Sequence, residues 1–144
     1  MVVGFLTVVA LGGATGVYFA GEAQHRRDRA DIVRWEARAL PAARDAETRQ
    51  EALRPTMPAA QVGEIRTALQ RDIDAIVAAP LPEIVRPAAA AYVEAIRKTA
   101  ASLEAVGSAS FERAQAQARS AFAAAAAAEQ TLVCRARLPA CSSP

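Results

Sequence analysis

The sequence predicts an all-α protein, with an N-terminal single transmembrane helix followed by a small antiparallel bundle of three or four helices. Three observations support this fold class. Residues 1–21 contain no charged side chain. Later apolar residues recur every three or four positions, which is the spacing of a helix that faces a core, and alternating strand patterns are absent. The 144 residues are 53% hydrophobic but only 5% aromatic, because alanine supplies much of the apolar content, and alanine favours helix.

The N-terminal segment has the length and composition of a membrane anchor. Residues 1–21 read MVVGFLTVVALGGATGVYFAG, and as a helix they span about 30 Å, the hydrocarbon thickness of a bilayer. A buried core helix of this length normally carries a polar face. A cleavable signal peptide normally begins with basic residues and ends at a small-x-small site, whereas no Lys or Arg precedes this apolar run. We expect a retained anchor in contact with membrane lipid, with the other two readings as alternatives.

Small residues recur at every fourth position within this segment, at Gly12, Gly16 and Ala20. This spacing puts them on one stripe of the helix, where another helix can approach closely in lipid. We therefore predict a helix-packing face for other membrane-protein subunits or for a second copy of the chain. The alternative is that glycine and alanine are simply common in membrane helices.

Two features disagree about the side of the membrane on which the remaining residues lie. The sequence EAQHRRDR follows the apolar run, and by the positive-inside bias it places them in the cytoplasm. Cys134 and Cys141, in the sequence CRARLPAC, have a spacing that can close a small disulfide loop in an oxidising compartment. We expect a single-pass protein of the cell membrane whose helical domain lies on the exoplasmic (periplasmic or extracellular) side. Free thiols on a cytoplasmic domain are the alternative.

Prolines divide the rest of the chain into predicted helices, at positions 41, 55, 58, 80, 82 and 87. The predicted segments are an anchor (1–21), a juxtamembrane helix (22–40), a helical bundle (41–137) and a C-terminal tail (138–144). The juxtamembrane helix continues the anchor and carries Trp35, the single tryptophan, into the core of the bundle.

Within the bundle, the clearest predicted helix covers 59–79. Its apolar stripe is formed by Val62, Ile65, Leu69, Ile73 and Ile76. An extended connector (80–87) follows, and Pro87 suits the first turn of a helix that Gly107 ends. Ser108 or Ser110 can cap the last helix, which runs to about residue 137. Its six alanines at 123–128 are expected to allow a neighbouring helix to approach closely.

The sequence contains no motif for catalysis or cofactor binding. Seventeen basic and fifteen acidic residues give a net charge of +2, which is too balanced for a nucleic-acid partner. Glu22 and His25 match one Glu-x-x-His element of a di-iron bundle, but such a site needs two copies and the chain has one histidine. Asp72 and Asp74 are two residues apart and therefore point to different sides of a helix. We predict no catalytic residue, no cofactor, no metal ligand and no enzyme activity.

An anchor with a small-residue stripe, joined to a domain without chemistry of its own, is typical of an accessory protein. The expected function is a non-enzymatic, membrane-anchored accessory or scaffolding subunit that docks on a larger membrane protein complex. The alternative is a membrane-tethered helical binding module with an apolar groove for a lipid or a peptide.

Overall fold

The computed structural model describes the backbone of residues 7–136 and the side chains of residues 22–136. Within this range the chain forms four α-helices and one 3₁₀ turn, and no strand, so the all-α prediction is confirmed. The elements are α1 (Thr7–Ala52), α2 (Ala59–Val77), η1 (Glu83–Val85), α3 (Arg86–Glu104) and α4 (Phe111–Arg135).

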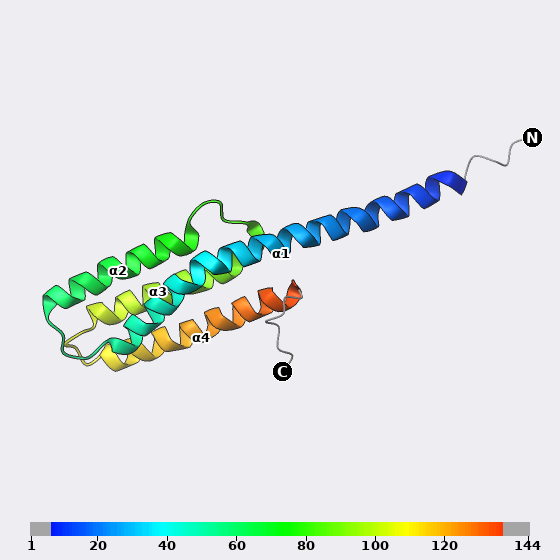
Figure 1. The fold of residues 1–144 in the computed structure, drawn as a ribbon. Coiled ribbons are helices and arrows are strands. Elements are labelled where there is room, and N and C mark those ends of the chain that lie inside the picture. Colours follow the sequence, from blue (N-terminus) through cyan, green and yellow to red (C-terminus); the bar gives the residue numbers. More distant parts are fainter. Residues whose placement is uncertain (1–6, 137–144) are drawn as a thin grey trace, which may run out of the picture.

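The helices run alternately up and down, and short turns join neighbours that are antiparallel (Figure 1). The most extensive contact is between α3 and α4, followed by the contact between α1 and α2. Only the C-terminal part of α1 lies among the other helices, and its N-terminal part projects beyond them (Figure 1). The sequence predicted a bundle of either three or four helices. The structure has four, because the C-terminal part of α1 is one of them.

Helix α1 passes through Pro41 without ending, so the predicted joint at this residue is wrong. A proline inside a helix removes one backbone hydrogen bond and clashes with the preceding turn, at a cost of about 3 kcal/mol. Ala39, Ala43 and Ala46, which flank Pro41, are all buried against the other helices. Packing on both sides of the proline therefore holds the helix together, while Pro41 itself is exposed.

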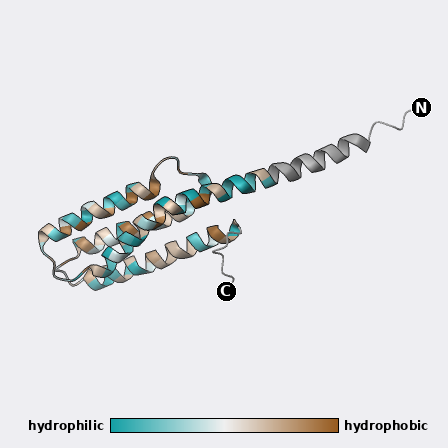
Figure 2. Cartoon of the chain, viewed as in Figure 1, coloured by the Kyte–Doolittle hydropathy of each residue, from teal (hydrophilic) through white to brown (hydrophobic). Residues whose placement is uncertain are grey.

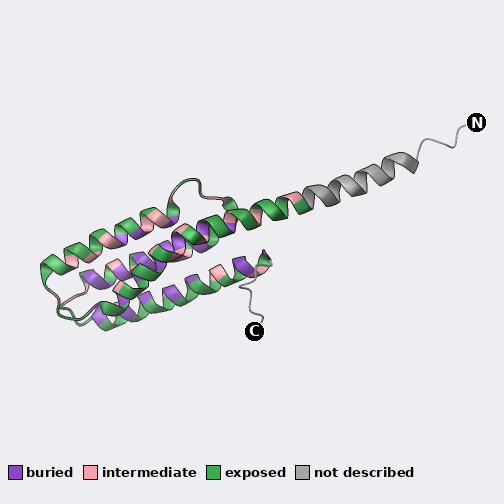
Figure 3. Ribbon diagram, viewed as in Figure 1, coloured by how far each residue is buried: buried purple, intermediate pink, exposed green. Residues whose placement is uncertain are grey.

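Residues 22–30 of α1 form an exposed rod, which we call the stalk. None of them is buried, and the first buried residue of the described side chains is Ile32 (Figure 3). The stalk is mostly hydrophilic, whereas the helices of the bundle contain both apolar and polar residues along their length (Figure 2). Its polar contacts are local, such as the 2.6 Å hydrogen bond from Gln24 to Asp28.

The core lies where the inner faces of the four helices meet. Trp35 is only 1% exposed, which confirms its predicted place in the core, and its ring lies 6.5 Å from that of Tyr92 on α3. The other large, fully buried apolar side chains come from all four helices and the connector: Phe111, Ile32, Leu53, Leu69, Ile76, Ile96 and Val85.

The structure confirms the predicted end of one helix and start of the next between residues 104 and 111. The predicted serine cap is not formed. Gly107 has φ +82°, in the left-handed region that favours glycine, and its N–H donates to the Pro55 carbonyl at 2.8 Å. This bond ties the α1–α2 turn to the α3–α4 turn. Ser110 occupies the N-cap position of α4 but makes no side-chain capping bond, because its hydroxyl contacts that of Ser108 instead.

Only one side of the alanine run of α4 packs against the neighbouring helices. Ala125 is buried, but Ala123, Ala124, Ala126 and Ala127 are exposed. The reason is that a continuous run covers every side of a helix, and only one side of α4 faces the core.

Candidate functional site

The residues predicted to form sites lie largely outside the described part of the chain. Gly12, Gly16 and Ala20 fall on the backbone of α1, but their side chains are not among those described. Cys134 lies near the end of α4, with its Sγ 3.6 Å from the Gln130 side-chain nitrogen, and Cys141 lies outside the described residues. The helix-packing stripe and the disulfide therefore stay predictions.

The candidate anchor, residues 1–21, also lies outside the part of the chain whose side chains the structure describes. Among residues 22–136, no helix is long and apolar enough to cross a membrane. Residues 1–21 lie outside that range.

Two hydrogen bonds from α1 to the end of α2 lie at the end of the bundle from which the stalk projects, which we call the stalk end. It consists of residues 31–38 of α1, the connector 78–85 between α2 and α3, and residues 128–136 at the end of α4 (Figure 1).

At the stalk end, α1 supplies partners for the last carbonyl groups of α2. The Trp35 indole N–H donates to the Ile76 carbonyl at 3.2 Å, and an Arg38 guanidinium N–H donates to the Ala78 carbonyl at 2.8 Å. The final carbonyls of a helix lack partners within the helix and carry the negative end of its dipole. A cation and an indole at this position therefore both satisfy these carbonyls and fix α2 beside α1.

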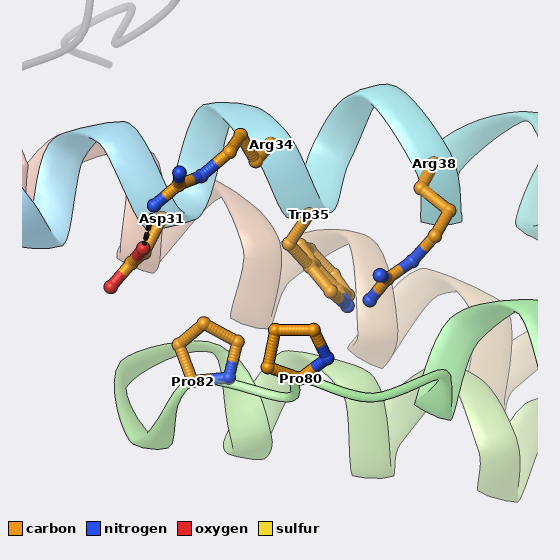
Figure 4. A pocket seen from close by; sticks show the side chains of 6 residues that line it. All are labelled: Asp31, Arg34, Trp35, Arg38, Pro80 and Pro82. Carbon is orange, nitrogen blue, oxygen red and sulfur yellow. Dashed lines mark hydrogen bonds and ion pairs between the residues drawn. The ribbon is translucent and has the colours of Figure 1, made fainter.

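A hollow of about 220 Å³ opens beside these two bonds (Figure 4). Trp35 and Arg38 point from α1 toward the connector, where the rings of Pro80 and Pro82 form the opposite wall (Figure 4). Asp31 and Arg34 complete the lining and form an ion pair at 2.5 Å. Since Trp35 is almost fully covered, a group that enters this hollow meets mainly guanidinium and proline surfaces.

One donor at this hollow has no partner among the described residues. The Arg38 Nε atom is buried and makes no hydrogen bond, although Nη2 of the same guanidinium donates to the Ala78 carbonyl. The lining contains two arginines and one aspartate, so the hollow carries a net positive charge. Its charge suits a small anionic group, and the carboxylate of Asp31 in the lining is paired with Arg34.

A second polar cluster joins α3, α4 and α1. The Tyr92 hydroxyl donates to the Glu129 carboxylate, and Glu36 of α1 lies within the electrostatic reach of Glu129. Burial and the hydrogen bond to Glu129 raise the pKa of Tyr92 above its ordinary range, so the phenol stays protonated as a donor. Burial, and then the charge of Glu129, raise the pKa of the Glu36 carboxyl. The hydrogen bond joins α3 to α4, and the Glu36 carboxyl of α1 lies near it.

The two neighbouring aspartates of α2 have opposite environments, as their spacing predicted. Asp72 is buried and pairs with Arg49 of α1, whereas Asp74 is exposed and accepts a 2.9 Å hydrogen bond from Gln70. Burial raises the pKa of Asp72 although the charge of Arg49 opposes the change. The partner of Asp72 lies 23 residues earlier on another helix, and no local pattern in the sequence reveals this pairing.

Glu22 and His25 both lie exposed on the stalk. Within the described residues, no group of three or more His, Cys, Asp or Glu side chains is arranged to hold a metal ion.

The chain matches no protein-family model, no curated protein and no solved structure.

Proposed function

We propose that this protein is a non-enzymatic, single-pass accessory subunit that docks on a larger membrane protein complex through its anchor. The observation that carries the proposal is the continuity of α1, which is one helix over Thr7–Ala52. The same helix contains most of the apolar segment and, further on, the buried residues Ile32, Trp35 and Ala39 of the bundle. A single rigid element therefore joins the proposed anchor to the core of the domain.

The stalk sets the distance between bundle and bilayer in this proposal. From Gly21 to Ile32 a helix rises about 16 Å, so the bundle stands clear of the lipid headgroups. An unbroken helix also fixes the rotation of the bundle about its axis relative to the anchor. A subunit built in this way presents one defined side of its domain to whatever its anchor binds.

The surface of the bundle exposes few large apolar side chains. In this proposal the anchor therefore supplies the main apolar contact with the partner complex. Among the described residues, the exposed large hydrophobic side chains are Val33, 50% exposed, and Val77, 42% exposed. Scattered apolar residues of this kind are normal on a monomeric surface and do not form a large apolar interface. The bundle is thus suited to polar contacts with a partner, and Gly12, Gly16 and Ala20 of the anchor to close helix packing in lipid.

The alternative, an apolar groove between the helices for a lipid or a peptide, finds no room at the centre of the bundle. Trp35, Ile96 and Phe122 belong to the buried core that fills the space between the inner faces of the helices.

Membrane association and docking are tested together on the full-length chain. After alkaline carbonate washing, the protein is expected in the membrane pellet. After mild detergent extraction, it is expected to migrate in blue-native electrophoresis well above the mass of a monomer. Recovery in the carbonate supernatant contradicts the anchor, and migration only as a free monomer contradicts docking.

A pair of insertions tests whether rigid continuity matters for docking. Two alanines inserted between Arg29 and Ala30 turn the bundle by about 200° about the helix axis, whereas four turn it by about 40°. We expect the two-residue insertion to abolish the high-mass species and the four-residue insertion to retain it. Equal behaviour of the two insertions contradicts a fixed orientation. Circular dichroism of both variants confirms that the bundle is folded.

A further inference from the structure

Helix α2 is buried far less than its neighbours. Nine residues of α3 are buried, but only Leu69, Asp72 and Ile76 of α2 are. All three lie in its second half, and residues 59–68 include no buried residue. In the first half of α2, Val62 and Ile65 pack against the core but are only partly buried.

A hollow of about 420 Å³ lies between this first half and the end of α3. On the α2 side it is lined by Ala59, Val62, Gly63 and Arg66, together with Met57 from the preceding turn. Gly63 brings no side chain, and no atom outside its own helix lies within 4 Å of the position that a Cβ would take. On the α3 side the lining is Leu103 and Val106. The two helices thus separate here instead of interdigitating.

Besides the buried side chains of Leu69 and Ile76, the second half of α2 has three polar contacts with α1. These are the ion pair between Arg49 and Asp72, the Trp35 indole bond to the Ile76 carbonyl and the Arg38 bond to the Ala78 carbonyl. Water can replace a hydrogen-bond partner when a polar interface separates, so such contacts add less net stability than an equal area of apolar core.

Both ends of α2 are joined to the bundle by proline-containing, non-helical segments, 53–58 and 78–82. The first joint is held in place, because the Pro55 carbonyl accepts the Gly107 N–H at 2.8 Å. Short non-helical segments therefore bound α2 on both sides, and the first of them is bonded to the turn between α3 and α4.

We propose that α2 opens as a unit from the body formed by α1, α3 and α4, at a lower free energy than the rest of the bundle unfolds. Opening breaks the three polar contacts with α1. It uncovers the apolar stripe of α2 and the surfaces of α1 and α3 beneath it, so the protein gains an apolar surface that the closed bundle does not offer. The opening of α2 does not depend on the proposed docking function.

Hydrogen exchange followed by mass spectrometry on the full-length chain in detergent tests the order of opening. We expect amides of 62–77 to exchange at least roughly tenfold faster than those of 92–103 and 116–133, after correction for intrinsic rates. Equal protection of α2, α3 and α4 overturns the proposal, because it means that the bundle opens in one step.

Two matched variants on α2 test the role of the ion pair. Asp72→Asn removes the partner of Arg49, and we expect it to speed exchange across α2 by about tenfold without changing α3 or α4. Asp74→Asn alters an exposed carboxylate on the same helix and is expected to leave all rates unchanged. Acceleration of α3 and α4 by the same factor as α2 in Asp72→Asn overturns the proposal. If Asp72→Asn does not fold, the profile of the unaltered chain still decides the order.

Discussion

Glu36 lies half-buried on α1, within the electrostatic reach of the Glu129 carboxylate on α4. Its pKa in the folded protein is raised from the ordinary value of 4.5, first by burial and then by the charge of Glu129. In the unfolded chain both causes are absent. The folded state therefore holds this proton more tightly than the unfolded state does, and this difference links the stability of the bundle to pH.

The sign of this linkage leads to a prediction for Glu36→Gln. As the pH rises from about 4.5 through the raised pKa, the unfolded chain loses the proton first and the contribution of Glu36 to stability falls. At pH 7 the ionised side chain is destabilising, so Glu36→Gln is expected to raise the midpoint of urea unfolding there. Below pH 4.5 the gain is expected to vanish. Glu22→Gln, on the exposed stalk, serves as the control with no gain at either pH, and a lower midpoint for Glu36→Gln at pH 7 contradicts the argument.

Two glycines with different backbone conformations give a second prediction. Gly107 has φ +82°, and Gly63 lies in the interior of α2 with open space around it. Gly107→Ala forces alanine into the left-handed region and is expected to lower the free energy of unfolding by about 1 kcal/mol. Gly63→Ala is expected to raise it by roughly 0.5–1 kcal/mol, because alanine favours helix. Urea unfolding monitored by circular dichroism measures both, and the same sign of change in both variants contradicts the assignment.

At the scale of single elements, α1 shows how packing overrides a local preference. Its residues on either side of Pro41 are buried on the same face, and the helix tolerates a proline that would end it in isolation. The cost of the proline remains in the folded state.

Removing that cost is expected to stabilise the protein. Pro41→Ala restores a backbone donor inside α1 and should raise the free energy of unfolding by roughly 1–3 kcal/mol. Pro87→Ala is the matched control, because Pro87 lies in the first turn of α3, where the backbone N–H has no partner within the helix. It is expected to change stability by less than about 0.5 kcal/mol. A gain for Pro87→Ala as large as that for Pro41→Ala would show that the position within the helix does not matter.

For the whole molecule, the proposed exoplasmic side and the proposed disulfide are tested by one labelling experiment in intact cells. A membrane-impermeant maleimide is expected to label Cys134 and Cys141 only after a reductant is added. Labelling that requires permeabilised cells places the bundle in the cytoplasm, and labelling without reductant excludes the disulfide. A variant with both cysteines changed to serine provides the background.

Features that depend on neighbouring residues could be predicted before the structure was known. The apolar stripe of 59–79 predicted α2, Pro87 the start of α3 and Gly107 its end, because helix periodicity and backbone conformation are set within a few residues.

Only the tertiary structure decided how those helices meet. The indole of Trp35 bonds a carbonyl 41 residues away, the Tyr92 hydroxyl bonds a carboxylate 37 residues away, and Asp72 finds Arg49 on another helix. The continuation of α1 through Pro41 was decided in the same way. Each of these depends on the rotation and order of whole helices, which are fixed when the four inner faces pack into one core, and no local pattern in the chain records that rotation.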